Sequence, residues 1–238
     1  CWGPEDAPLL VMVHGWMDVG ASYQFVVDAL ENDYRVIAPD WRGFGGSKNC
    51  AIPEQDAISS HWQDVAHLID QLKLDNFILM GYSMGATTAM HGMKHAQLAQ
   101  QLKAYLHIDQ TPKISVDSTW EYGLFGPLHT QFKQLLNDIY QLLLKHKNAK
   151  YLYELSLPDR QELVRLWVDF IELQSSNPFS PLVFKTALKQ PFLQKYLLPI
   201  QRLDYLFWYV ENYLYHNEDY REAIQQLACP TTFFIGRN

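Results

Sequence analysis

The feature that most constrains the fold of this chain is the alternation of short apolar segments with amphipathic ones. The apolar runs have the length and composition of buried strands, and the segments between them have helical spacing. Strands are predicted at residues 9–13, 34–38, 77–81, 103–109 and 231–235, and helices at 22–31, 61–72 and from 84 toward 100. Because this alternation requires crossover connections, the sequence predicts an α/β fold with a mainly parallel sheet flanked by helices.

The middle of the chain has a different pattern, with helices only between residues 112 and 228. Apolar residues recur there at spacings of three and four, in Phe132, Leu135, Leu136, Ile139, Tyr140 and Leu143. Further helices are predicted at 160–173, 184–197 and 202–215. A helical insertion of this length cannot thread through a sheet, so we expect a cap above the strand ends. The predicted domains are a first core part at 1–114, a helical cap at 115–227 and a core strand at 228–238.

Both ends of the sequence resemble cuts through a larger domain. A Gly-Pro turn leads at once into the first predicted strand, and the last predicted strand has no helix after it. Such an ending is poor architecture for a parallel sheet. We therefore expect a chain truncated at both ends, so that a targeting signal would lie in the missing N-terminus.

Composition excludes several classes of function. Lys and Arg total 19 against 26 Asp and Glu, a net charge of −7 without a basic run, which argues against nucleic acid as a partner. The apolar stretch at 203–214 is interrupted by Asp204 and Glu211 and is too short to span a membrane. The three cysteines are far apart, which favours a reducing, cytoplasmic compartment over a disulfide framework or a zinc site: Cys1, Cys50 and Cys229. No metal and no organic cofactor is predicted.

The sequence G-Y-S-M-G stands where the third predicted strand meets a helix. A sharp turn at Ser83 brings the flanking backbone close together, which favours the small residues Gly81 and Gly85. Such a turn exposes the serine hydroxyl and directs the N–H of Met84 toward the same space. The pattern also occurs by chance in many chains, so the surrounding residues must decide its meaning.

Residues that follow strands in an open α/β sheet are the place to look for chemistry. After the first predicted strand come His14 and Gly15, and the N–H of Trp16 can face the serine as a second oxyanion donor. The glycine-rich turn after the second predicted strand lacks a phosphate-loop lysine. We expect Asp40 and Arg42 to hold that turn by hydrogen bonds.

Four motifs together resemble the α/β-hydrolase fold with a helical cap. They are H-G-W, D-W-R-G-x-G-x-S, G-Y-S-M-G and C-P-T-x-F-F-I-G, within residues 8–112 and 229–236. The resemblance implies a hydrolase for a carboxylic ester, thioester or lactone, with Ser83 as the nucleophile of an acyl-enzyme mechanism. It also implies oxyanion donors at Met84 and Trp16 and a supporting role for His14 in the oxyanion loop.

The resemblance places an acid and then a histidine after the nucleophile. The acid is either Asp109, after the strand that follows the elbow helix, or a residue beyond Asn238; Asp109 can equally cap the turn at 110–112. We expect the catalytic histidine in further sequence, because each of the nine present is better explained as structural or solvated: His14, His61, His67, His91, His95, His107, His129, His146 and His216.

Two alternatives stay open. The sequence also resembles the cofactor-free quinolone dioxygenases of the same fold, which carry a histidine where this chain has Asp18. A binding homologue that has lost its base is the other alternative. The expected ligand is a small apolar or aromatic substrate, with Trp120, Tyr122 and Phe125 as candidate pocket residues. The aromatic helix at 203–215 could instead support a homo-oligomer.

Overall fold

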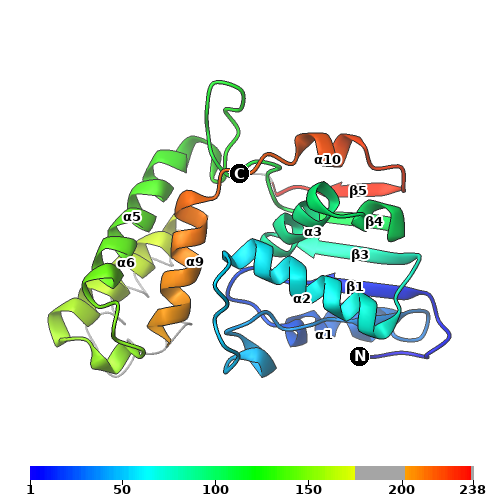
Figure 1. Ribbon diagram of the computed structural model, residues 1–238, viewed down its shortest axis with the longest axis horizontal. Helices are drawn as coiled ribbons and strands as arrows, with labels where there is room; N and C mark the ends of the chain where they lie inside the picture. Colours follow the sequence, from blue (N-terminus) through cyan, green and yellow to red (C-terminus); the bar gives the residue numbers. More distant parts are fainter. Residues whose placement is uncertain (175–201, 237–238) are drawn as a thin grey trace. The chain divides into compact units, whose positions relative to one another are not determined.

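The computed structural model describes residues 1–174 and 202–236, and the chain divides into two compact units (Figure 1). The sheet unit contains Cys1–Lys113 and the segment from Glu218 onward; the helical unit contains Ile114–Asn217. Residues 218–227 group with the sheet unit, whereas the sequence pattern assigned them to the helical segment. The helix predicted at 184–197 lies outside the described residues.

All four strand pairings in the described residues are parallel, which agrees with the mainly parallel sheet that the sequence predicts. Its strands are β1 (Leu9–Val13), β2 (Arg35–Ile37), β3 (Phe77–Tyr82), β4 (Leu102–Ile108) and β5 (Thr231–Phe234), in the order β2-β1-β3-β4-β5. The register pairs Val13 with Gly81 and Tyr82 with Ile108, so β1, β3 and β4 end side by side. Their carboxyl ends therefore form one edge, where the loops that follow them meet.

Helices cover both faces of this sheet. On one face the helix α1 (Gln24–Leu30) and the short η1 (Gly20–Tyr23) pack in a core with Leu10, Met12 and Met80. Helices α2 (Ala57–Leu72) and α3 (Met84–His95) lie across the near side of the strands in Figure 1. The remaining short elements are η2 (Gly45–Ser47), α4 (Leu98–Gln101) and α10 (Arg221–Gln225).

Helix α2 begins four residues earlier than the sequence pattern predicts. Asp56 is its N-cap, and its Oδ1 accepts a hydrogen bond of 3.0 Å from the Ser59 N–H. An Asp in this position satisfies an N–H that has no partner within the helix. The cap extends the helix through Ala57 and Ile58, which are both fully buried.

The helical unit is built around aromatic and aliphatic side chains. Its elements are η3 (Gly126–Leu128), α5 (His129–Lys145), η4 (Leu152–Glu154), α6 (Leu157–Gln174) and α9 (Leu203–Tyr215). Phe132 on α5 is buried, with ring centroids 4.6 Å from Phe125 and 6.2 Å from Phe170. Among the described helices, none combines the length and the apolar character needed to cross a bilayer.

Two chain segments connect the units. Within each unit, contacts join these two segments to each other. Within the sheet unit, Lys113 and Asp219 form an isolated antiparallel bridge, and the Tyr220 N–H donates to the Pro112 carbonyl over 2.9 Å. Within the helical unit, Ser115 Oγ donates to Asn217 Oδ1 over 2.6 Å.

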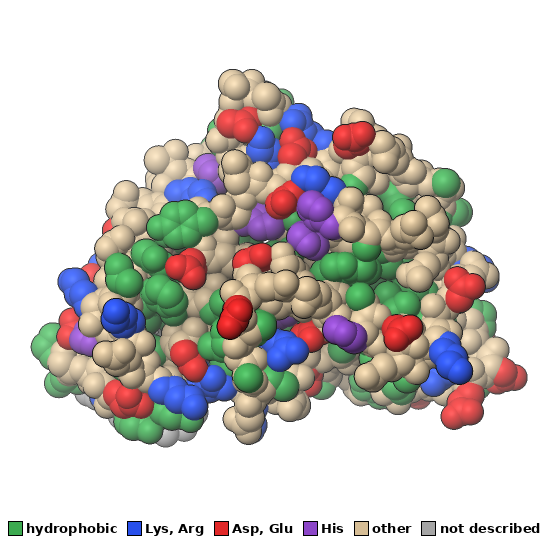
Figure 2. Space-filling model, viewed as in Figure 1, with side chains coloured by type: hydrophobic (Ala, Val, Ile, Leu, Met, Phe, Trp, Pro, Cys, Tyr) green, Lys and Arg blue, Asp and Glu red, His purple; other side chains and the backbone are tan. Residues whose placement is uncertain are grey.

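On the face shown in Figure 2, basic and acidic side chains are interspersed, without a large patch of one sign.

Candidate functional site

Ser83 occupies a strained turn between β3 and α3. Its backbone has φ 50° and ψ −117°, a conformation that is costly for a residue with a side chain. A Cβ atom added at Gly85 would lie 2.2 Å from the Val13 carbonyl oxygen, and one added at Gly81 would lie 2.8 Å from the Ala86 Cα. Glycine is thus required at both positions by close backbone approach, as the sequence predicts for a nucleophile elbow.

The turn places backbone donors at the start of α3. Met84 is the first residue of this helix, and the first N–H groups of a helix have no partner within it. The loop after β1 also lies close to Ser83, because a Cβ atom at Gly15 would be 3.3 Å from the Ser83 Cβ. Trp16 is the next residue of that loop. The geometry is compatible with an oxyanion site formed by the N–H groups of Met84 and Trp16.

His14 fixes the loop after β1 through both ring nitrogens. Nδ1 lies 2.7 Å from the Gly15 carbonyl, and Nε2 accepts the Trp41 N–H over 3.1 Å. These partners require a neutral ring with its proton on Nδ1. Burial lowers the pKa of His14, and His14 is completely buried. Its ring is therefore a support for the loop, with no lone pair available to act as a base.

The turn after β2 is held by a carboxylate and an ion pair. Asp40 accepts the Gly20 N–H over 2.7 Å and the Gly46 N–H over 2.8 Å. Arg42 binds Asp64 on α2 through two hydrogen bonds of 2.6 and 2.7 Å. Both side chains thus have the structural role that the sequence indicates, because they join this turn to its neighbours.

Asp109 follows β4 next to the elbow. The Ser83 N–H donates to the carbonyl of the preceding residue, Ile108, over 2.9 Å. Asp109 has φ 49°, and its Oδ1 accepts the Gly236 N–H over 3.0 Å. In the turn that follows, the Gln110 side chain accepts the Thr111 N–H over 2.9 Å. The Asp109 carboxylate thus points to the end of β5, and the cap of the turn comes from Gln110.

Two further buried histidines of the sheet unit have structural surroundings. On β4, His107 contacts the Tyr105 hydroxyl at 3.0 Å and the Gln110 carbonyl at 2.8 Å, and burial lowers its pKa. His61 stacks on Trp41 at 4.5 Å, and burial lowers its pKa to about 3. Since both nitrogens of His14 and His107 have partners, neither of these rings is a base for Ser83.

Tyr23 and Tyr82 were not identified from the sequence. Burial raises the pKa of both phenols, and the charge of Asp18 raises both further; for Tyr82 the charge of Asp109 adds more than that of Asp18. Both phenols therefore stay protonated at neutral pH. Tyr23 is 8% exposed, and its hydroxyl has no hydrogen-bond partner among the described residues. Its sequence pattern is that of a core residue, and Tyr82 stands at a variable position of the elbow motif.

The three aromatic residues predicted for the substrate pocket all belong to the helical unit. Trp120 and Tyr122 pack against each other with centroids 5.4 Å apart, and Tyr122 is 63% exposed. Phe125 contacts Phe132 and Phe170, so its ring contributes to the core of that unit. Their role in a pocket stays a prediction.

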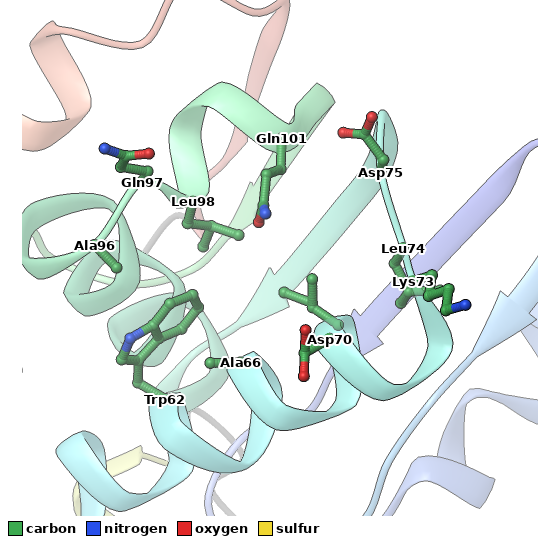
Figure 3. A pocket seen from close by; sticks show the side chains of 11 residues that line it. Trp62, Ala66, Asp70, Lys73, Leu74, Asp75, Ala96, Gln97, Leu98 and Gln101 are labelled. Atoms are coloured by element: carbon green, nitrogen blue, oxygen red, sulfur yellow. The ribbon is translucent and has the colours of Figure 1, made fainter.

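A cavity of about 470 Å³ lies at the opposite edge of the sheet, next to the residues that precede β3 and β4 (Figure 3). Its lining includes the apolar side chains of Ile69, Leu74 and Leu98 and the polar side chains of Asp70 and Gln101. Because this is the amino edge of the strands, the cavity is separate from the elbow. Across residues 1–174 and 202–236, no group of three or more His, Cys, Asp or Glu side chains is arranged to hold a metal ion.

Comparisons with known proteins agree with this fold. The sequence model of the α/β-hydrolase fold matches residues 8–238. A serine hydrolase-like protein of Danio rerio is 26% identical over 156 residues, which cover 64% of this chain and 45% of that protein. A pimeloyl-[acyl-carrier protein] methyl ester esterase of Vibrio atlanticus is 38% identical over 93 residues, 38% of this chain and 32% of the esterase. The chain thus spans less than half the length of these two relatives.

Solved structures show the same architecture. A thermophilic esterase from Thermogutta terrifontis superposes with a TM-score of 0.66 at 16% identity, covering 99% of this chain and 72% of the esterase. This identity supports the shared fold alone. Together with the match over residues 8–238 and the parallel sheet, it leads to one conclusion. The chain belongs to the α/β-hydrolase fold family.

Proposed function

We propose that this protein is an ester hydrolase in which Ser83 is the nucleophile. The observation that carries the proposal is the strained conformation of Ser83, with φ 50° between two glycines that cannot accept a side chain. Strain of this kind costs about 1–3 kcal/mol and persists where the surrounding structure enforces it. It exposes a hydroxyl between two candidate oxyanion donors, which a purely structural turn does not need. The similarity to a serine hydrolase-like protein and to two esterases supports the same reaction class.

In the proposed reaction the Ser83 Oγ attacks the carbonyl carbon of a carboxylic ester, thioester or lactone. A histidine takes the hydroxyl proton and passes it to the leaving alcohol or thiol, and water then hydrolyses the acyl-enzyme. The N–H groups of Met84 and Trp16 stabilise the negative charge on the carbonyl oxygen. Asp109 is the proposed acid, because it lies one residue beyond the backbone partner of Ser83.

The proposal needs a base, and the buried histidines His14, His61 and His107 do not supply it. The esterase structure is longer than this chain, which covers 72% of it. We therefore assign the catalytic histidine to sequence outside residues 1–238. We also propose that the helical segment acts as a cap that encloses a small apolar or aromatic substrate.

The test is covalent labelling of the natural full-length protein with a fluorophosphonate probe, followed by intact mass measurement. One adduct is expected on the wild type and none on Ser83→Ala. Ser47→Ala is the matched control, because Ser47 lies in another glycine-rich turn of the sheet unit. The proposal fails if the wild type takes no adduct, or if Ser83→Ala is labelled as readily as Ser47→Ala.

A further inference from the structure

The turn that carries Asp109 is joined to the elbow and its helix at two places. One is the backbone contact described above, in which the Ser83 N–H donates to the Ile108 carbonyl over 2.9 Å. The other is a side-chain contact, in which Gln110 Nε2 donates to Thr87 Oγ1 over 2.9 Å. Thr87 lies one turn after the elbow on α3, and its N–H donates to the Ser83 carbonyl over 3.1 Å. Both contacts therefore join the turn to the start of α3.

The orientation of the Gln110 side chain follows from its partners. Its Oε1 accepts the Thr111 N–H over 2.9 Å, and a backbone N–H can only donate. The amide nitrogen must therefore face Thr87, whose hydroxyl oxygen accepts the hydrogen bond. Thr87 is completely buried, so this acceptor is fixed in the packed part of the helix.

A buried histidine holds the backbone of the same residue. His107 Nε2 lies 2.8 Å from the Gln110 carbonyl, which can only accept, so this nitrogen carries the proton of the neutral ring. Nδ1 then accepts the Tyr105 hydroxyl over 3.0 Å, and both rings are 1% exposed. Gln110 is thus held through its carbonyl by β4 and through its side-chain amide by α3.

The hydrogen bonds that Asp109 itself makes lead to β5 and not to the elbow. Its N–H donates to the Phe234 carbonyl over 2.8 Å, and its Oδ1 accepts the Gly236 N–H over 3.0 Å. Asp109 is exposed, and among the described residues Oδ2 has no hydrogen-bond partner, so this oxygen is available to a histidine. The acid of a triad must keep its place relative to the nucleophile. The side-chain contact that maintains this relation comes from the next residue, Gln110.

We propose that Gln110 is a positioning residue that fixes the carboxylate of Asp109 relative to Ser83, by joining the turn after β4 to Thr87 on α3. This inference rests on the proposed function, in which Asp109 is the triad acid. Gln110 touches neither the substrate nor the reacting atoms and acts only through Asp109. Without the contact to Thr87 the carboxylate can shift, and a displacement of about 1 Å can lower a rate by about 100-fold.

The test is Thr87→Val in the full-length protein, because valine has the shape of threonine without the acceptor oxygen. On p-nitrophenyl butyrate we expect kcat to fall by about 10- to 100-fold and KM to stay within about twofold, since substrate binding does not involve the contact. Thr87→Ser restores the hydroxyl and should recover most of kcat. Thr88→Val is the matched control, because Thr88 is equally buried but its hydroxyl donates to the Met84 carbonyl within α3. It should keep kcat within about twofold.

A double mutant shows whether Thr87 acts through Asp109. In Asp109→Asn the position of the triad carboxylate no longer matters, so the addition of Thr87→Val should lower kcat by less than about twofold. The proposal is overturned if Thr87→Val keeps the kcat of the wild type, or if Thr87→Ser loses as much as Thr87→Val. It is equally overturned if Thr87→Val causes the same loss in Asp109→Asn as in the wild type.

Hydrogen exchange separates this proposal from that of the function. It is measured by mass spectrometry on the Ser83→Ala protein, in a peptide that spans residues 108–112. Thr87→Val should speed the exchange of the Asp109 and Thr111 N–H groups by about tenfold, because the turn is no longer held to α3, and Thr88→Val should not. Faster exchange in a protein that hydrolyses no ester would support the positioning role and refute the function alone. Unchanged exchange in Thr87→Val would overturn the positioning role and leave the function intact.

Discussion

Replacing Gly85 by alanine tests whether close packing of α3 on β1 sets the geometry of the elbow. The new Cβ would lie 2.2 Å from the Val13 carbonyl oxygen and 2.6 Å from its carbon, and both are backbone atoms without rotamer freedom. Real Cβ contacts essentially never fall below 3.0 Å, so helix and strand must separate by about 0.8 Å. Overpacking of this kind costs about 1–3 kcal/mol, and we expect the upper end because a backbone must move.

The assay for this variant is urea unfolding of the full-length protein, read by tryptophan fluorescence. With a slope of roughly 2 kcal/mol per M, a loss of about 3 kcal/mol moves the midpoint down by roughly 1.5 M. Gly46→Ala is the control, because its Cβ meets the Asp40 side chain at an ordinary 3.5 Å; we expect a change within about 0.5 kcal/mol there. Equal unfolding free energies for the two variants would refute the argument from close packing.

Three further predictions concern charged and titratable groups of the sheet unit. Burial lowers the pKa of His61 to about 3, so the unfolded chain binds a proton that the folded one excludes; stability is full above about pH 6.5 and falls toward pH 3. Between pH 7 and 5 the loss is about 2 kcal/mol, and His61→Phe should remove it from the pH dependence of the urea midpoint. Arg42→Lys replaces the two-bond contact with Asp64 and should lower the unfolding free energy by about 1 kcal/mol or less, since the pair is partly exposed. If Asp109 is the triad acid, Asp109→Asn should lower kcat on p-nitrophenyl butyrate by about 10⁴-fold. A decrease under tenfold would show that Asp109 is not the triad acid and that its role is the structural hydrogen bond to Gly236.

The fold was largely predictable because its signals are local. The apolar strands and the amphipathic segments between them predicted the parallel sheet, and all five strands begin and end within one residue of their predicted bounds. The order of strands in the sheet has no such local signal. The predicted start of α2 is four residues too late, because the apolar periodicity alone does not reveal the N-cap at Asp56.

The candidate site was predictable only where it depends on the backbone. Gly81 and Gly85 indicate a tight turn in any sequence, and the structure shows the close approaches that require them. The partner of Asp109 could not be predicted, because Gly236 lies 127 residues further along the chain. Tyr23 was equally hidden, since a buried hydroxyl without a partner among the described residues is a property of the folded neighbourhood.

Backbone strain gives an independent reason to place function at the carboxyl edge. Among the described residues, three non-glycine positions with left-handed φ follow strands β1, β3 and β4: Met17, Ser83 and Asp109. Lys73 and Asn76 have similar φ values at the opposite edge, but Lys73 ends a helix and Asn76 accommodates this conformation with little penalty. Asp109 tolerates this conformation as Asn76 does, and Phe125, with φ 68°, lies in the helical unit. For Met17 and Ser83 no such local explanation exists, and each costs of order 1 kcal/mol. These two positions follow the neighbouring strands β1 and β3, and that is the pattern expected when geometry at Ser83, rather than stability, determines the conformation.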